Sequence, residues 1–193
     1  DIEHEEMIVD NCAMQLVMNP HRFDVIVTTN LFGDILSDLC AGLTGGLGLA
    51  PGANVGEHKG IFEAVHGSAP DIAGKGIANP SGLLRGAIMM LDHLNLDRLA
   101  ETIENAWLAT IEAGIHTGDI YGENSTRKVG TAEFADAIIE HAALQDATPL
   151  RLHSGDERER RGTGMQWLCQ ELGRKAEHTP YRPRQGLQLR NEV

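Results

Sequence analysis

Two aspartates, Asp34 and Asp38, stand four residues apart in a segment whose apolar spacing predicts a helix. On a helix this spacing directs both carboxylates to the same face, where like charges repel unless a cation lies between them. Carboxylates with room for water are the ligands that Mg²⁺ and Mn²⁺ prefer. The alternative is a solvated helix face that carries two acids, and spacing alone favours that alternative.

The surrounding elements predict an α/β fold. A β-branched run at residues 24–29 is typical of a short interior strand, and residues 61–65 form a second such run. Between them lies a glycine-rich stretch that must turn and pack closely. Asn79-Pro80 predicts a helix start, with asparagine as the N-cap and proline at the first helical position. Short strands alternating with helices predict parallel strands, and such folds bind ligands at the strand ends. Helices are predicted over 5–18, 31–43, 97–113, 131–143 and after residue 80.

Composition excludes several classes of function. A net charge of −12 disfavours nucleic acid as a partner, because phosphates are bound through Lys and Arg. No run approaches eighteen apolar residues, so we expect neither a transmembrane helix nor a membrane partner. The three cysteines are far apart and lack Cys-x-x-Cys spacing, which argues against a zinc site or a disulfide framework. We therefore expect a cytoplasmic protein, or one of the mitochondrial matrix if the source is eukaryotic.

Charge divides the chain in two. Residues 151–193 hold nine of the sixteen Lys and Arg but only six of the twenty-eight Asp and Glu, and helical periodicity fades beyond about residue 143. We expect one α/β domain over residues 1–143. Residues 144–193 are then a basic tail, mostly disordered or unrelated to the domain.

The segment around the two aspartates, NLFGDILSDLCAGLTGGLG at residues 30–48, resembles the metal-binding signature of the isocitrate/isopropylmalate dehydrogenase family of β-decarboxylating dehydrogenases. The likeness covers residues 1–143, which implies the C-terminal half of such an enzyme. It also implies the isopropylmalate dehydrogenase-like fold in partial form, which is not a Rossmann fold. Asp34 and Asp38 would bind Mg²⁺ or Mn²⁺, with Asp34 in the catalytic site. Asp10, on a helix that resembles the family's upstream helix, would reach the metal of a partner subunit, so we expect a homodimer with shared active sites.

A second resemblance concerns the dinucleotide. The chain has neither Gly-x-Gly-x-x-Gly nor a Gly-Lys-Ser/Thr loop, but HGSAPDIAGKGIANP at residues 66–80 is similar to the family's own dinucleotide loop. The segment TGDIYG at residues 117–122 resembles the part that closes over adenine, although Gly-Asp is also common turn chemistry. The resemblance implies cofactor contacts at Glu63, His66, Gly67, Ser68, Ala69, Asn79 and Asp119.

Asp71 and Ile72 indicate which cofactor is used. A carboxylate accepts hydrogen bonds from a ribose 2′-hydroxyl but repels a 2′-phosphate. NADP-using relatives carry Lys-Tyr where this sequence has Asp71-Ile72. The sequence therefore predicts NAD.

Together these resemblances imply metal-dependent oxidative decarboxylation of a 2-hydroxy acid, with NAD as hydride acceptor. Isocitrate is the expected substrate, and the NAD-dependent isocitrate dehydrogenases are the nearest group. The alternatives are 3-isopropylmalate, homoisocitrate or tartrate dehydrogenase, and an inactive fragment or regulatory subunit. The family's general-acid tyrosine and lysine match no position here, so we expect the isolated chain to be inactive.

Overall fold

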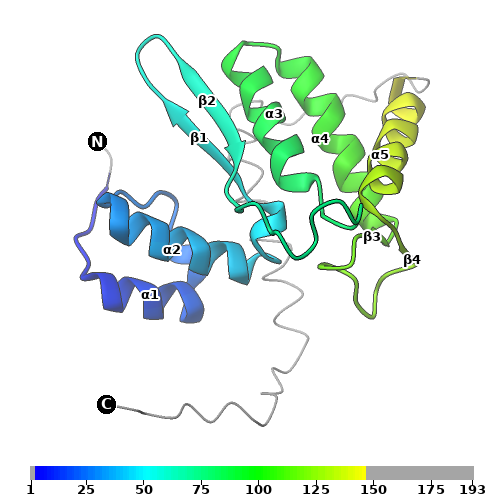
Figure 1. The fold of residues 1–193 in the computed structure, drawn as a ribbon. Coiled ribbons are helices and arrows are strands. Elements are labelled where there is room, and N and C mark those ends of the chain that lie inside the picture. Colours follow the sequence, from blue (N-terminus) through cyan, green and yellow to red (C-terminus); the bar gives the residue numbers. More distant parts are fainter. Residues whose placement is uncertain (1–2, 147–193) are drawn as a thin grey trace.

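The computed structural model describes residues 3–146 (Figure 1). Two helices and a turn form an N-terminal unit, a β-hairpin follows, and three helices form a second body beside the hairpin. None of the helices in this part of the chain is long and apolar enough to cross a membrane. The predicted tail from residue 147 onward, together with Cys169, lies outside the described residues.

The N-terminal unit consists of α1 (Val9–Met18), a 3₁₀ turn (Pro20–Arg22) and α2 (Asn30–Leu43). Cys12 and Leu16 of α1 are buried against Leu36 of α2, as the three-to-four spacing of apolar residues requires. The structure confirms both predicted helices, although α1 begins four residues later than predicted.

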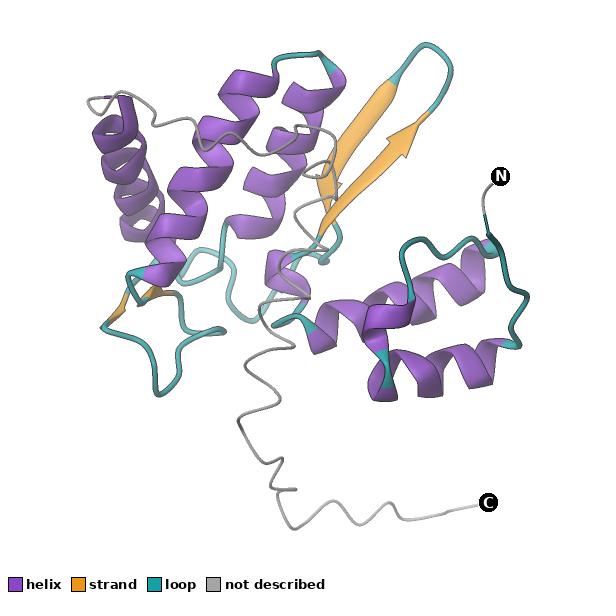
Figure 2. Ribbon diagram, turned by 180° about the vertical axis from the view of Figure 1, so that it is seen from behind, coloured by secondary structure: helices purple, strands orange, loops and turns teal. Residues whose placement is uncertain are grey.

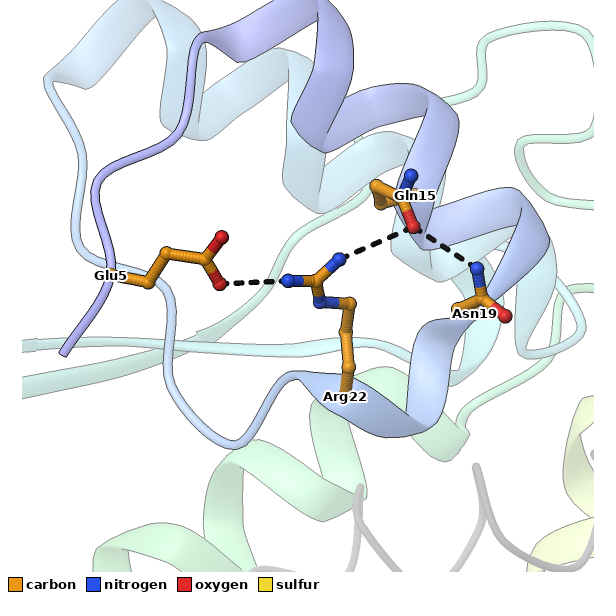
Figure 3. Close-up of polar contacts among 4 residues, drawn as sticks. All are labelled: Glu5, Gln15, Asn19 and Arg22. Carbon is orange, nitrogen blue, oxygen red and sulfur yellow. Dashed lines mark hydrogen bonds and ion pairs between the residues drawn. The ribbon is translucent and has the colours of Figure 1, made fainter. Parts of the chain in front are cut away.

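A polar network joins the end of α1 to the residues that precede it. Arg22 donates to Glu5 Oε2 at 2.7 Å and to Gln15 Oε1 at 3.4 Å, and Asn19 donates to the same Gln15 oxygen at 3.0 Å (Figure 3). Glu5 thus contacts Arg22 from outside the helix, which begins at Val9.

The predicted strand at residues 24–29 is not formed. No strand among residues 3–146 pairs with it, and Val25 and Val27 are 81% and 92% exposed. The preference of β-branched residues for strands reflects packing against neighbouring strands, and this segment has no such neighbour in the described part of the chain. It forms an extended connection that leads into α2.

The β-hairpin pairs β1 (Pro51–Val55) with β2 (Gly60–Ala64), and Gly52 lies opposite Glu63. The strand predicted at 61–65 is confirmed as β2, whereas β1 falls in the stretch that we expected only to turn. The pairing is antiparallel, so the prediction of parallel strands is wrong here. A four-residue connection closed by a Gly56 N–H to Lys59 carbonyl bond permits only an antiparallel pair. Among residues 3–146, parallel pairing occurs only between β3 (Ile115–His116) and β4 (Arg127–Lys128), each two residues long.

The second body contains α3 (Ser81–His93), α4 (Asp97–Glu112) and α5 (Thr131–Asp146). Figures 1 and 2 show α3 between the hairpin and α4, with α5 on the far side of α4. All three predicted helices are confirmed, and α5 continues three residues beyond the predicted domain boundary. Their core is built from Leu49, Ala106, Trp107, Val129, Phe134 and Ile138.

Candidate functional site

Two residues expected at the cofactor meet where α3 begins. Asn79 Nδ2 donates to Asp119 Oδ2 at 3.0 Å, and Thr117 Oγ1 donates to the other oxygen, Asp119 Oδ1, at 2.6 Å. Asn79 Oδ1 accepts the backbone N–H of Ser81, the first residue of α3, at 3.0 Å. The N-cap position itself falls on Pro80, one residue later than the Asn79 cap predicted from Asn-Pro. We call Asn79, Thr117 and Asp119 the Asn79 clamp, because they join the end of the loop at 66–79 to the segment at 117–122.

The last glycine of the 30–48 segment lies against this clamp. A Cβ placed on Gly48 would lie 2.9 Å from Asp119 Oδ2 and 3.3 Å from Asn79 Cβ, so a side chain there would have to displace the Asp119 carboxylate. The segment that carries Asp34 and Asp38 therefore ends in contact with the loop that resembles the dinucleotide loop.

The loop at 66–79 is also fixed to the start of α5. The Thr131 backbone N–H donates to the Gly76 carbonyl at 2.8 Å, and its hydroxyl donates to the Ala78 carbonyl at 2.5 Å. Gly130 approaches so closely that a Cβ there would lie 2.6 Å from the Gly76 oxygen. One end of the loop is thus held at three points, by α3, α5 and the Asn79 clamp.

The remainder of the loop is open to solvent. Its expected cofactor residues His66, Gly67, Ser68, Ala69 and Asp71 are exposed, while Ile72 is partly buried. His66 contributes a contact from Nδ1 to the carbonyl of Gly67 at 2.9 Å. Ala69 has a positive φ of 42°, which is uncommon for a residue with a side chain and marks a tightly turned backbone. A backbone turned in this way and open to solvent can approach a ligand closely.

Polar groups of α3 and α4 interact with one another next to the start of α3. Trp107 Nε1 donates to Ser81 Oγ at 2.9 Å, and the guanidinium of Arg85 lies 4.9 Å from the centre of the Trp107 ring. Arg85 also pairs with Glu104 at 3.8 Å. Burial lowers the pKa of Arg85, an effect that Glu104 opposes, and burial raises the pKa of Glu104, an effect that Arg85 opposes.

The expected metal ligands are placed as follows. Asp34 and Asp38 are exposed on α2, and neither carboxylate has a hydrogen bond or ion pair within residues 3–146. Asp10 is exposed in the first turn of α1, where Oδ1 accepts the adjacent Asn11 N–H at 2.6 Å. The part of the chain that the structure describes contains no group of three His, Cys, Asp or Glu side chains that could hold a metal. The structure therefore does not bring Asp10 to the other two aspartates within one chain.

Glu63 lies apart from the clamp, on β2, where its Oε1 accepts from Asn54 Nδ2 across the hairpin at 3.0 Å. Of the predicted cofactor residues, only Asn79 and Asp119 are joined by a bond between two side chains. Sequence reasoning missed Thr117, Ser81 and Trp107. The Thr-x-Asp spacing at 117–119 was a usable signal for the first, because Thr and Asp two residues apart form local turns. Nothing local indicated the Trp107 contact.

These features define an α/β protein with two carboxylates on one helix face and a capped, glycine-containing loop beside it. Residues 1–138 match the family described as isocitrate/isopropylmalate dehydrogenase, and the chain belongs to this family.

Several named relatives share this region. The isocitrate dehydrogenase [NADP] of Rickettsia felis is 59% identical over 71% of the chain and 29% of that protein. The isocitrate/homoisocitrate dehydrogenase of Thermus thermophilus is 57% identical over 70% of the chain and 39% of that protein. The mitochondrial isocitrate dehydrogenase [NAD] catalytic subunit 5 of Arabidopsis thaliana is 52% identical over 73% of the chain and 37% of that protein.

A solved structure of an isocitrate dehydrogenase is also similar to this chain. Isocitrate dehydrogenase from Methylococcus capsulatus superimposes with a TM-score of 0.70 at 55% identity, covering 74% of this chain and 41% of that one. The chain thus spans well under half the length of the proteins it matches.

Proposed function

We propose that this chain supplies two metal-binding carboxylates and the dinucleotide loop of an NAD-dependent, oxidatively decarboxylating isocitrate dehydrogenase. The observation that carries the proposal is the contact between the two motifs, where Gly48 of the 30–48 segment lies against Asn79 and Asp119. Two motifs that must act on one substrate and one cofactor are thereby packed together in a chain of the appropriate family.

Asp34 and Asp38 fit a divalent cation, Mg²⁺ or Mn²⁺. Both are exposed on α2 at helical spacing, and neither carboxylate is engaged by another residue between 3 and 146. The oxygen donors suit these hard cations, and the exposure leaves room for water and substrate oxygens. A cation bound there would supply Lewis-acid polarisation of the hydroxyl-bearing substrate.

The third metal ligand would be Asp10 of a second copy in a homodimer. Asp10 is exposed and joins no metal-binding group with residues of its own chain in the described part. The helix that carries it also exposes Met14, Val17 and Met18 by 49%, 58% and 65%. Burial of such apolar side chains against another subunit would stabilise the dimer. We therefore propose shared active sites.

The loop at 66–79 would bind the dinucleotide, with its adenosine end near the Asn79 clamp. The clamp and Thr131 fix this end of the loop, and its exposed backbone at 67–69 can approach the cofactor. Glu63, on the adjoining hairpin, is assigned to the nicotinamide side. The residues of this chain bind and orient the cofactor, whereas the general acid and base would come from elsewhere in the intact enzyme.

NAD rather than NADP is the proposed cofactor, on the strength of Asp71. The names of the relatives described above include both [NADP] and [NAD], so these names do not decide which cofactor this chain binds. Asp71 is exposed and makes no ion pair within residues 3–146, so its charge is available to repel a 2′-phosphate.

Homoisocitrate is a second candidate substrate, favoured by the name of the Thermus thermophilus relative. Because the chain spans well under half of its relatives, we expect the isolated chain to bind cofactor without turning over either acid. NADH production by purified chain would contradict that expectation.

The test is a calorimetric titration of the chain with NAD and with NADP. We expect NAD to bind more tightly, and Asp71→Lys/Ile72→Tyr to shift the ratio of the two dissociation constants by about tenfold towards NADP, which is the effect of a 1.4 kcal/mol charge interaction. Glu57→Lys/His58→Tyr, a matched pair of changes in the exposed hairpin loop, should leave the ratio unchanged. An unchanged ratio in the Asp71 variant, or tighter binding of NADP by the wild type, would refute the choice of NAD.

A further inference from the structure

A continuous series of hydrogen bonds runs through the Asn79 clamp. The hydroxyl of Thr117 donates to one oxygen of Asp119, Asn79 Nδ2 donates to the other, and Asn79 Oδ1 accepts from Ser81. The two hydrogen-bond partners of the Asn79 amide have fixed roles, because the Asp119 carboxylate only accepts and the Ser81 backbone N–H only donates. A flipped Asn79 amide would set oxygen against carboxylate and N–H against N–H. The network therefore permits one orientation of the Asn79 amide.

Thr117 begins the network from inside the protein. Its side chain is 0% exposed, so it cannot touch a bound nucleotide. Asp119, by contrast, is exposed, and a carboxylate at the surface is free to turn unless it is held. The 2.6 Å bond from Thr117 holds one oxygen and thereby aims the other at Asn79.

We infer that Thr117 is a positioning residue for the adenosine end of the dinucleotide, acting through Asp119 on Asn79. The inference rests on the proposed function, since it assumes that the loop ending at Asn79 binds the cofactor. Without the Thr117 hydroxyl, Asp119 turns towards water, the Asn79 amide loses its fixed partner, and the end of the loop samples orientations that do not bind.

The predicted size of this effect is modest. One hydrogen bond to a partly exposed carboxylate is expected to change affinity by about three- to tenfold. Thr117→Val keeps the shape of the side chain and removes only the hydroxyl, so the buried site stays filled. Thr117→Ser keeps the hydroxyl and is expected to restore most of the affinity.

The experiment measures dissociation constants of the 193-residue chain for AMP, nicotinamide mononucleotide and NAD. AMP probes the adenosine end and nicotinamide mononucleotide the other end. Thr117→Val should weaken AMP and NAD alike by about three- to tenfold and leave nicotinamide mononucleotide unchanged. Thr102→Val is the matched control, because its hydroxyl bonds only to the Arg98 carbonyl of its own helix, away from the clamp.

A double-mutant cycle with Asp119→Ala tests the route of the effect. If Thr117 acts through Asp119, then Thr117→Val has no further effect on AMP binding once Asp119 is alanine. Additive losses would overturn the inference, as would an unchanged AMP affinity in Thr117→Val or equal losses for both half-cofactors. A wild-type chain that binds neither AMP nor NAD would instead overturn the proposed function, and this inference with it.

Discussion

The indole N–H of Trp107 donates to the hydroxyl of Ser81 at 2.9 Å, and both side chains are buried, at 1% and 0% exposure. Trp107 belongs to the core between α4 and α5, whereas Ser81 is the first residue of α3, two positions after Asn79. The hydrophobic core is thereby joined by a hydrogen bond to the point where the loop at 66–79 ends.

Trp107→Phe is expected to lower the free energy of unfolding by about 1–3 kcal/mol, because it removes the donor to a buried hydroxyl and leaves space in the core. Urea denaturation followed by circular dichroism measures the loss. In a Ser81→Ala background the indole N–H already lacks its acceptor, so Trp107→Phe should lower the free energy of unfolding by less. Equal costs in the two backgrounds would show that the hydrogen bond contributes nothing.

Gly130→Ala is expected to displace the loop at Gly76, since the new methyl group would lie 2.6 Å from a backbone oxygen that cannot swing aside. We predict a loss of about 1–3 kcal/mol in unfolding free energy and weaker AMP binding. Gly56→Ala, in the hairpin loop, is the control, because the nearest atom to its added Cβ is the Lys59 carbonyl oxygen at 3.6 Å, an ordinary van der Waals distance. The close approach is refuted if the two variants are equally stable and bind AMP equally.

The free energy of unfolding should fall as pH rises from acid towards neutral, because of two carboxyl groups on α3 and α4. Burial, with the nearby Asp97 and Glu101, raises the pKa of Asp92 above its ordinary 3.8, and burial raises that of Glu104 above 4.5. A raised carboxyl pKa means that the folded chain binds the proton more tightly than the unfolded one. Its contribution to stability is full below the ordinary pKa and is lost as pH rises through the folded value.

Asp92→Asn should therefore reduce the loss of unfolding free energy that occurs as pH rises above 3.8, the ordinary pKa of aspartate. Asp136→Asn, at an exposed position on α5, is the matched control and should leave the slope close to that of the wild type. Parallel pH profiles for wild type and Asp92→Asn would contradict this assignment.

Local rules accounted for the helices and placed the start of α3 to within one residue. Asn79-Pro80 carries its own signal, because asparagine and proline favour a helix start without any distant partner, although the N-cap falls on Pro80. Residues 24–29 carry an equally clear strand signal, but a strand requires a neighbouring strand, and residues 3–146 provide none there. The residue types at 24–29 favour a strand, but they do not supply the second strand with which it must pair.

The candidate site divides in the same way. Asp34 and Asp38 share a helix, so their spacing was sufficient to place both on one face. The Asn79 clamp depends on a contact across forty residues, and the role of Thr117 becomes visible only when that contact is formed. Gly48 shows the same limit, because the residue that crowds it is Asp119, seventy-one positions later.

If Asp34 and Asp38 bind a divalent cation as we propose, the chain should bind Mn²⁺, which electron paramagnetic resonance detects. We expect saturable loss of the free Mn²⁺ signal with the wild-type chain and with Asp136→Asn. Asp34→Asn/Asp38→Asn should lose this binding, because only carboxylate oxygens at these positions attract the ion. Equal Mn²⁺ binding by that double variant and the wild type, or no binding by the wild type, would show that the two aspartates do not form a metal site in this chain.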